Sequence, residues 1–173
     1  MANRAIFNRL YTEFSPGTTP VWLVNGGSIS SIGPSTETFF QAGADLIPGE
    51  VVYISGVHPL SFAFPASAAS GVQEDQFRAV GITLAGANIF EQVPVTLDDI
   101  ALVTPDNILG DTALIPGQYY FLSKVNGKLT PFSSSAGTVT VDNGYSAMTN
   151  LGLALSTTTI HVEIQPPVDL FGN

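Results

Sequence analysis

The feature that most constrains the fold is a ten-residue segment that occurs twice in the chain. Residues 46–55 (LIPGEVVYIS) return as residues 114–123 (LIPGQYYFLS), so the offset in residue number is 114 − 46 = 68. A second match follows in the same order, because residues 80–84 (VGITL) correspond to residues 151–155 (LGLAL), at an offset of 151 − 80 = 71. A loop insertion in the second copy would leave this small drift. We therefore predict an internal duplication, in which one supersecondary unit is used twice.

Each copy of the repeat begins with a Pro-Gly pair, at Pro48-Gly49 and at Pro116-Gly117. Proline presets φ at the first corner of a turn and glycine accepts a positive φ at the second, so the pair predicts a tight turn. The apolar, β-branched and aromatic residues that follow are typical of a strand buried on both faces. The strand should return over residues 60–64 in the first copy. In the second copy Asn126-Gly127 predicts the hairpin turn and residues 129–132 the return strand.

Strand-like segments recur about every 8 to 12 residues, which predicts an all-β sandwich or barrel built from two duplicated β-hairpin units. We assign residues 21–104 to the first β unit and residues 105–173 to the second, packed on the first as one compact body. Residues 88–96 should form a strand that pairs with the preceding one. Residues 97–102 should form a helical turn, with carboxylates near its start where the helix dipole favours them.

Residues 1–20 differ from the rest of the chain and are predicted to form either a short helix or an extended N-terminal arm. The helix is favoured by apolar residues at helical spacing, namely Ile6, Phe7, Leu10, Tyr11 and Phe14. The arm is the alternative because terminal segments often stay extended until a neighbouring subunit holds them.

The composition contains unusually few charged residues: 45% of the chain is hydrophobic and only 11% is charged, against the roughly 25% charged of ordinary domains. A surface so poor in charge is typical of a protein that partners cover. The net charge of −9 argues against nucleic acid, which needs clustered Lys and Arg, and against anionic membranes. The chain has no cysteine, which excludes disulfides and thiolate zinc sites.

No set of residues in the sequence has the spacing of a catalytic or metal site. His58 precedes a proline in a turn, and His161 alternates with apolar residues, so it should face outward from a strand. Asp98-Asp99 is interpreted as a solvated or dipole-capping pair. The sequence Asp142-Asn143-Gly144 lacks the later acidic ligands of a calcium loop and is interpreted as a turn. We predict no catalytic residue, no metal ion and no cofactor.

Two further predictions concern strand residues. Because side chains alternate along a strand, one of Tyr119 and Tyr120 should face out, at an interface or a ligand. Gly81 and Gly152 are isolated within strand-like segments, which is typical of a bulge or of a close approach between backbones.

Several of these segments together resemble a β-rich module of tailed-bacteriophage structural proteins. The resemblance is carried by the Pro-Gly turns, by YYFLS (119–123), GKLT (127–130) and LGLALSTTTIHVEI (151–164), and by Pro166-Pro167; it covers about residues 44–168. The module is found in head decoration (cement) proteins and in parts of tail fibres. It has no catalytic set that can be mapped onto this chain.

The resemblance implies a structural virion protein that is made in the host cytoplasm and then binds the outside of an icosahedral phage head and stabilises it. Its partners would be the major capsid protein and further copies of itself, with a trimer as the expected homo-oligomer. Interface residues are expected in the N-terminal segment: Arg4, Ile6, Phe7, Arg9, Leu10 and Phe14. The alternative is a tail-fibre or adhesin module that binds a host surface glycan. An enzyme is the least favoured interpretation, because no activated nucleophile is apparent.

Overall fold

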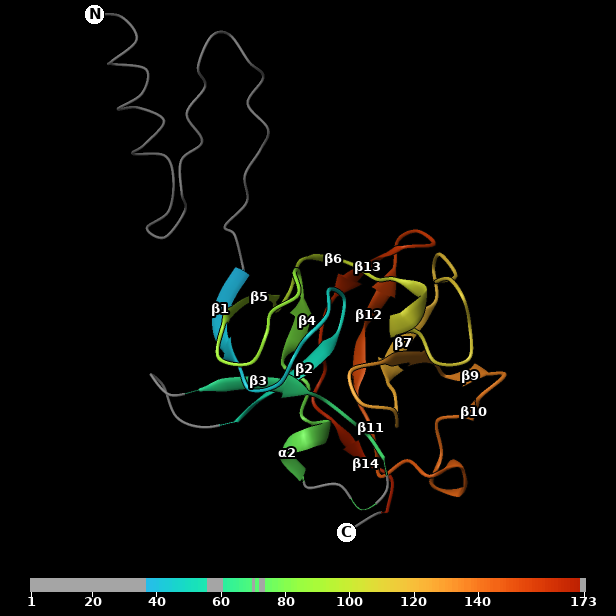
Figure 1. The fold of residues 1–173 in the computed structure, drawn as a ribbon. Helices are drawn as coiled ribbons and strands as arrows, with labels where there is room; N and C mark the ends of the chain where they lie inside the picture. The colour runs from blue at the N-terminus through green and yellow to red at the C-terminus, as the bar shows by residue number, and fades with distance from the viewer. Residues whose placement is uncertain (1–36, 56–60, 70, 72–73, 172–173) are drawn as a thin grey trace, which may run out of the picture. The chain divides into compact units, whose positions relative to one another are not determined.

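The regular structure of the chain is almost entirely β-strand, as Figure 1 shows for the computed structural model. The structure describes residues 37–55, 61–69, 71 and 74–171. Within these residues the helical elements are short: α2 (Glu74–Phe77) and the 3-10 turns η1 (Pro105–Asn107) and η2 (Val141–Asn143). The prediction of an all-β fold is therefore confirmed.

The first five strands close into a barrel in the order β1-β3-β2-β4-β5. They are β1 (Glu37–Ala42), β2 (Val51–Ser55), β3 (Phe62–Pro65), β4 (Gly81–Thr83) and β5 (Gln92–Thr96). Neighbouring strands are antiparallel except β1 and β3, which run parallel and close the barrel. Closure removes the edge strands on which other chains can pair.

The next strands form a five-stranded antiparallel sheet, in the order β6-β13-β12-β7-β8. They are β6 (Ile100–Leu102), β7 (Tyr119–Leu122), β8 (Leu129–Pro131), β12 (Asn150–Ala154) and β13 (Thr159–Val162). A parallel bridge joins Ile108, beyond β6, to Leu129 in β8. Two short ribbons complete the fold: β9 (Ser133–Ser134) with β10 (Gly137–Thr138), and β11 (Ala147–Met148) with β14 (Val168–Asp169).

The barrel and the second sheet have the same strand order, which confirms the predicted duplication. In chain order β1, β2, β3, β4 and β5 correspond to β6, β7, β8, β12 and β13. Equivalent hydrogen bonds recur, because Gly49 N–H donates to the Thr83 carbonyl and Gly117 N–H donates to the Ala154 carbonyl, both at 2.8 Å. The parallel bridge beyond β6 corresponds to the parallel pairing of β1 with β3.

One glycine in each repeat lies where two strands approach closely. Gly81 in β4 faces the carbonyl of Thr96 in β5, and Gly152 in β12 faces the carbonyl of His161 in β13. A Cβ atom at either position would collide with that carbonyl, and Gly152 also has a φ of +145°, which L side chains rarely adopt. The predicted close approach of backbones at these glycines is confirmed.

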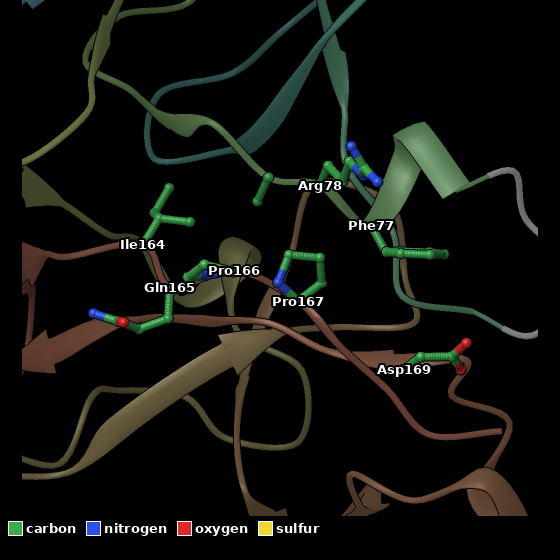
Figure 2. Close-up of a pocket in the computed structure, with 8 residues that line it drawn as sticks. Phe77, Arg78, Ile164, Gln165, Pro166, Pro167 and Asp169 are labelled. Carbon is green, nitrogen blue, oxygen red and sulfur yellow. The ribbon is translucent and has the colours of Figure 1, made fainter. Parts of the chain in front are cut away.

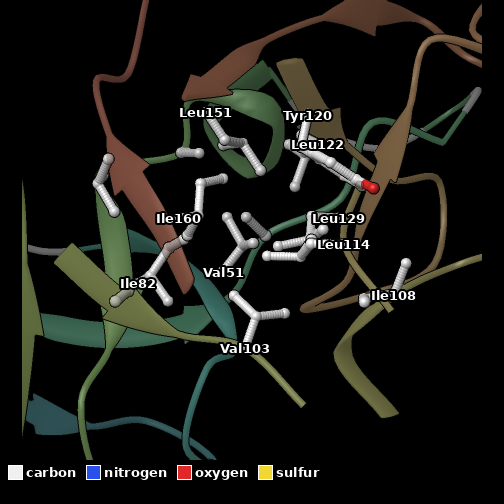
Figure 3. Packing of buried hydrophobic residues seen from close by; sticks show 14 of the residues in the cluster. Val51, Ile82, Val103, Ile108, Leu114, Tyr120, Leu122, Leu129, Leu151 and Ile160 are labelled. Atoms are coloured by element: carbon white, nitrogen blue, oxygen red, sulfur yellow. The ribbon is translucent and has the colours of Figure 1, made fainter. Parts of the chain in front are cut away.

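Two hydrophobic cores lie on opposite sides of the barrel wall. The smaller core fills the barrel and contains Ala42, Leu46, Val52, Ala63, Val93 and Val95. The larger core fills the inner face of the second sheet, and Figure 3 shows Val51 and Ile82 within it. These two side chains belong to β2 and β4, on the outside of the barrel. The outer wall of the barrel therefore covers the inner face of the second sheet.

Backbone hydrogen bonds also join the two repeats, around the hairpin turn between β7 and β8. Val51 N–H donates to the Gly127 carbonyl at 2.8 Å, and Gly127 N–H donates to the Ala66 carbonyl at 2.8 Å. Ala68 N–H donates to the Ser123 carbonyl at 2.9 Å. Because these bonds run between backbones, they fix the orientation of the two repeats more firmly than side-chain packing alone.

The region around residue 100 differs from its prediction. The helical turn predicted for residues 97–102 is wrong, because Ile100–Leu102 pairs with β13 as strand β6. The Asp99 carboxylate accepts a hydrogen bond from Ile100 N–H at 2.7 Å, and strand pairing takes over from there. The chain passes from the barrel to the second sheet between Thr96, where β5 ends, and Ile100, where β6 begins.

Candidate functional site

The titratable residues that the sequence singled out form no metal-binding cluster within the part of the chain that the structure describes. His161 is exposed on β13, as predicted, whereas His58 lies outside the described residues. Asp142 belongs to the η2 turn, which ends at Gly144 with a φ of 82°, so the interpretation as a turn is confirmed. Within the described ranges, no three His, Asp or Glu side chains come together to hold a metal ion. In the same part of the chain, no helix has the length and apolar character needed to span a membrane.

A groove of about 850 Å³ lies between α2 and the segment that leads to β14 (Figure 2). It is lined by Phe77, Arg78, Ala79, Ile164, Gln165, Pro166, Pro167 and Asp169. Arg78 and Asp169 are the ionisable residues of this lining, and the Asp169 carboxylate already accepts a hydrogen bond from Phe171 N–H at 2.8 Å. The groove therefore has a concave shape and one ionisable side chain of each sign, but its lining contains no nucleophilic side chain beside a general base.

A more distinctive feature is the tip of the β4–β5 connection, residues 88–91, which we call the 88–91 tip. It displays Ile89 and Phe90 to solvent, and the Phe90 side chain is 65% exposed. Among the described residues, Phe90 is the non-glycine residue with a positive φ, at 71°. A bulky side chain in this region is a strained outlier, which costs on the order of 1–3 kcal/mol and persists only where surrounding contacts impose it.

Hydrogen bonds to residues 41–45 and within the loop hold the conformation of the 88–91 tip. Phe90 N–H donates to the Ala42 carbonyl at 2.7 Å, and the Phe90 carbonyl accepts from Gln41 Nε2 at 3.0 Å. Ile89 N–H donates to Asp45 Oδ1 at 3.0 Å. Glu91 Oε2 accepts from Asn88 N–H at 2.8 Å. The tip is therefore a rigid apolar projection with two carboxylates, those of Asp45 and Glu91, at its base.

The 88–91 tip is an elaboration of the first repeat. Strand β4 corresponds to β12 at an offset in residue number of 71 (Ile82 to Leu153), whereas β5 corresponds to β13 at an offset of 65 (Thr96 to His161). The connection is therefore longer in the first repeat, by the difference 71 − 65 = 6. The prediction of a strand beginning at residue 88 is wrong, because β5 begins at Gln92. Loops that one copy has gained on a shared scaffold are typical places for function.

A second exposed apolar surface covers the outside of the second sheet. Strand register places Ile100, His161, Leu153 and Tyr119 side by side in a row across β6, β13, β12 and β7. The next row contains Leu102, Thr159 and Leu155. We call these seven residues the outer face. Its four most exposed apolar side chains, Ile100, Leu102, Tyr119 and Leu155, are between 48% and 58% exposed.

The central row of the outer face is covered in one repeat and exposed in the other. The residues of the barrel that correspond to Tyr119 and Leu153 are Val51 and Ile82, which are fully buried against the second sheet. Thr96, which corresponds to His161, is fully buried as well. The row that contains Tyr119, Leu153 and His161 in the second copy is therefore buried at its equivalent positions in the first copy, whereas the position of Leu102 is exposed in both copies, since its equivalent in the first is the exposed Phe39.

The tyrosine pair at the start of β7 divides between the two faces, as predicted. Tyr119 is 52% exposed on the outer face, whereas Tyr120 is fully buried in the larger core. The Tyr120 hydroxyl accepts a hydrogen bond from Ile115 N–H at 2.9 Å. Burial raises the pKa of Tyr120 above that of a free phenol, the hydrogen bond from Ile115 N–H lowers it, and the negative charge of Asp111 raises it further.

The first repeat satisfies the equivalent backbone N–H in a different way. Ile47 N–H, which corresponds to Ile115 N–H, donates to Glu50 Oε2 at 3.0 Å. Partial burial of Glu50 raises the pKa of its carboxyl, and the hydrogen bond from Ile47 lowers it. The Thr83 hydroxyl also enters this turn, because it donates to the Ile47 carbonyl at 2.6 Å and accepts from Glu50 N–H at 2.9 Å. Glu50 is thus a structural carboxylate.

The sequence anticipated only part of these surfaces. The predicted interface residues Arg4, Ile6, Phe7, Arg9, Leu10 and Phe14 lie outside the described residues. Tyr119 was identified through strand alternation, but Ile89, Phe90, Ile100 and Leu102 were missed. Asn88, a common turn residue, was the available signal for the 88–91 tip. A comparison with known proteins adds nothing further, since no protein-family model and no curated protein matches the chain.

Proposed function

We propose that this chain is a structural protein that attaches to a larger protein particle, and that the particle is the icosahedral head of a tailed bacteriophage. As a capsid decoration, or cement, protein it would bind the outside of the head and stabilise it. The observation that carries the attachment role is the 88–91 tip, a strained and hydrogen-bonded loop that displays Ile89 and Phe90 to solvent. The identity of the particle rests on the resemblance of residues 44–168 to phage structural modules.

The 88–91 tip has the properties of a preformed anchor. Ile89 and Phe90 are 47% and 65% exposed, so burying the remainder of each in a pocket would contribute about 1–2 kcal/mol. The loop is already held in place by Ala42, Asp45 and Gln41, so little ordering entropy is lost on binding. The carboxylates of Asp45 and Glu91 flank the apolar pair, and the whole chain carries a charge of −9. The matching site on the major capsid protein would be an apolar pocket with a basic rim.

We also propose that the chain is not an enzyme and needs no cofactor. The groove of Figure 2 is lined by proline, phenylalanine, alanine, isoleucine and glutamine besides Arg78 and Asp169. These residues supply no nucleophile with an adjacent base. The acidic net charge likewise supports protein partners, namely the capsid protein and further copies of the chain, over nucleic acid or membrane.

A binding assay with heads that lack the protein tests the attachment. Purified protein is added to such heads and the bound fraction is measured by co-sedimentation, with cryo-electron microscopy to locate it. Phe90→Asn should lower occupancy at least about tenfold while the protein stays folded, because asparagine tolerates a positive φ but removes the ring. Phe39→Asn is the matched control, since Phe39 is similarly exposed, at 59%, on β1.

Two further arms separate the alternatives. Deleting residues 2–14 should also lower occupancy if the N-terminal segment with Arg4 and Arg9 helps to anchor the protein. Equal occupancy for wild type and Phe90→Asn would contradict the role of the 88–91 tip. No binding to heads, together with binding to a host glycan on an array, would replace the cement role by the adhesin role.

A further inference from the structure

We propose that the outer face of the second sheet is a self-association surface, which packs against the same face of a second copy of this chain about a two-fold axis. This assigns the self partner within the assembly role proposed above, and it can be tested without phage heads. The pairing would be isologous, so that each residue of the row Ile100–His161–Leu153–Tyr119 meets the corresponding row of the partner.

The internal duplication supplies the first reason. In the barrel, the positions equivalent to Tyr119 and Leu153 are Val51 and Ile82, and both are fully buried by the sheet of the other repeat. Within the chain, the second sheet therefore already covers the positions of the first repeat that correspond to Tyr119 and Leu153. In the second repeat the same positions hold Tyr119, which is larger than Val51 and exposed, and Leu153, which is partly exposed.

The closure of the barrel decides which surface can cover the outer face. In the chain, the covering surface is the inner face of the second sheet, whose edge strands β6 and β8 do not pair with each other. The barrel offers no such face, because its interior is closed and filled by Val52, Val93 and Val95. The inner face of the second sheet is in turn filled by Val51 and Ile82. A second copy therefore has no free inner face with which to cover the outer face of the first. The symmetric alternative is that the outer faces of the two copies pack against each other.

The size of the outer face suits such a contact. A fully exposed large side chain has an area of about 200 Å², so the four half-exposed apolar residues present roughly 400 Å² together. The largest apolar patch on an ordinary monomer is about 300–600 Å², and often functional. A standard interface buries about 800 Å² per partner, somewhat more than half of it apolar. The outer face can therefore supply the apolar centre of a standard interface, with its surroundings supplying the polar rim.

Charge also permits two copies to meet at this surface. The seven residues of the outer face include no Asp, Glu, Lys or Arg. The nearest carboxylates along the strands are those of Asp98 and Asp99, which precede Ile100, and that of Glu163, which follows His161. Two stacked sheets lie about 10 Å apart with strands about 30° from parallel. At that distance the uncharged rows meet, while the −9 charge of each copy gives a repulsion that salt weakens.

Sedimentation velocity and light scattering of the full-length protein test the inference, over about 1 to 100 μM. The wild type should be a dimer that dissociates on dilution, and added salt should strengthen it. Leu102→Glu and Leu155→Asn should each weaken association at least about tenfold, because both remove apolar contact from the interface. Phe39→Glu is the matched control, since Phe39 on β1 occupies the position equivalent to Leu102 and is 59% exposed.

Each other result overturns the inference. A wild type that stays monomeric at the highest concentration shows that the outer face does not bind a second copy. A trimer shows that the contact is not isologous, and a dimer that Leu102→Glu and Leu155→Asn leave intact shows that another surface is used. Phe90→Asn should leave the dimer unchanged, so failure of self-association and failure of head binding are separate observations.

Discussion

Replacing Gly152 by alanine tests the close approach between β12 and β13. The new Cβ atom would collide with the carbonyl oxygen of His161. Both groups belong to the backbones of paired strands, so the collision cannot be relieved by rotating a side chain. The φ of +145° adds backbone strain of about 1–2 kcal/mol for a residue with a Cβ atom. Overpacking adds about 1–3 kcal/mol or more, and we expect a total loss of about 4 kcal/mol.

Two matched glycines separate the contributions. Gly81→Ala meets the equivalent carbonyl, that of Thr96, but without a positive φ. Gly117→Ala has a φ of +82° with no other group within 4 Å of the new Cβ atom, so only the backbone strain of about 1–2 kcal/mol applies. The expected order of destabilisation is therefore Gly152→Ala, then Gly81→Ala, then Gly117→Ala.

Urea unfolding followed by far-UV circular dichroism measures all three variants. A loss of about 4 kcal/mol is a large part of the roughly 5–15 kcal/mol that stabilises a typical domain, so Gly152→Ala should unfold at a much lower urea concentration than wild type. If Gly152→Ala and Gly117→Ala had the same midpoint, the strands would be able to separate at no cost, and the reasoning from the carbonyl contact would be refuted.

Two further predictions concern the paired turns. Burial raises the pKa of Glu50 above its ordinary value of 4.5, so the stability that this carboxyl confers is complete below pH 4.5 and is lost as the pH rises through its higher folded value. Glu50→Gln should therefore gain stability relative to wild type as the pH rises from about 4 to about 8. Urea unfolding midpoints of both proteins across this range measure the effect. A difference between the two midpoints that does not change with pH would contradict the prediction. Tyr120→Phe leaves Ile115 N–H without its acceptor and should cost about 1–3 kcal/mol. Tyr119→Phe on the exposed side of β7 should cost almost nothing, and equal urea midpoints for the two variants would show that the hydrogen bond is unimportant.

The parts of the fold that the sequence predicted are those set by neighbouring residues. Pro48-Gly49 and Pro116-Gly117 determine their turns locally, and Asn126-Gly127 forms the predicted hairpin turn between β7 and β8. Alternation along β7 likewise separates Tyr119 from Tyr120. Each of these outcomes depends on backbone preferences or strand periodicity within a few residues.

The parts that were missed depend on contacts between distant segments. Residues 100–102 become a strand because β13, which lies far along the chain, pairs with them, and pairing overrides local preference. Phe90 adopts its strained φ because Ala42, Asp45 and Gln41 bind the loop. The burial of Ile82 follows from how the repeats dock, because the repeated segments themselves are apolar in both copies.

The unequal closure of the two repeats has a consequence for the order in which they are made. The barrel spans Glu37 to Thr96 and has its own core, whereas the later sheet needs Val51 and Ile82 of the barrel to complete its own. Since the amino-terminal half leaves the ribosome first, the barrel can be finished before the rest of the chain exists. The second repeat can then fold against the outer wall of the finished barrel, where Val51 and Ile82 complete its core.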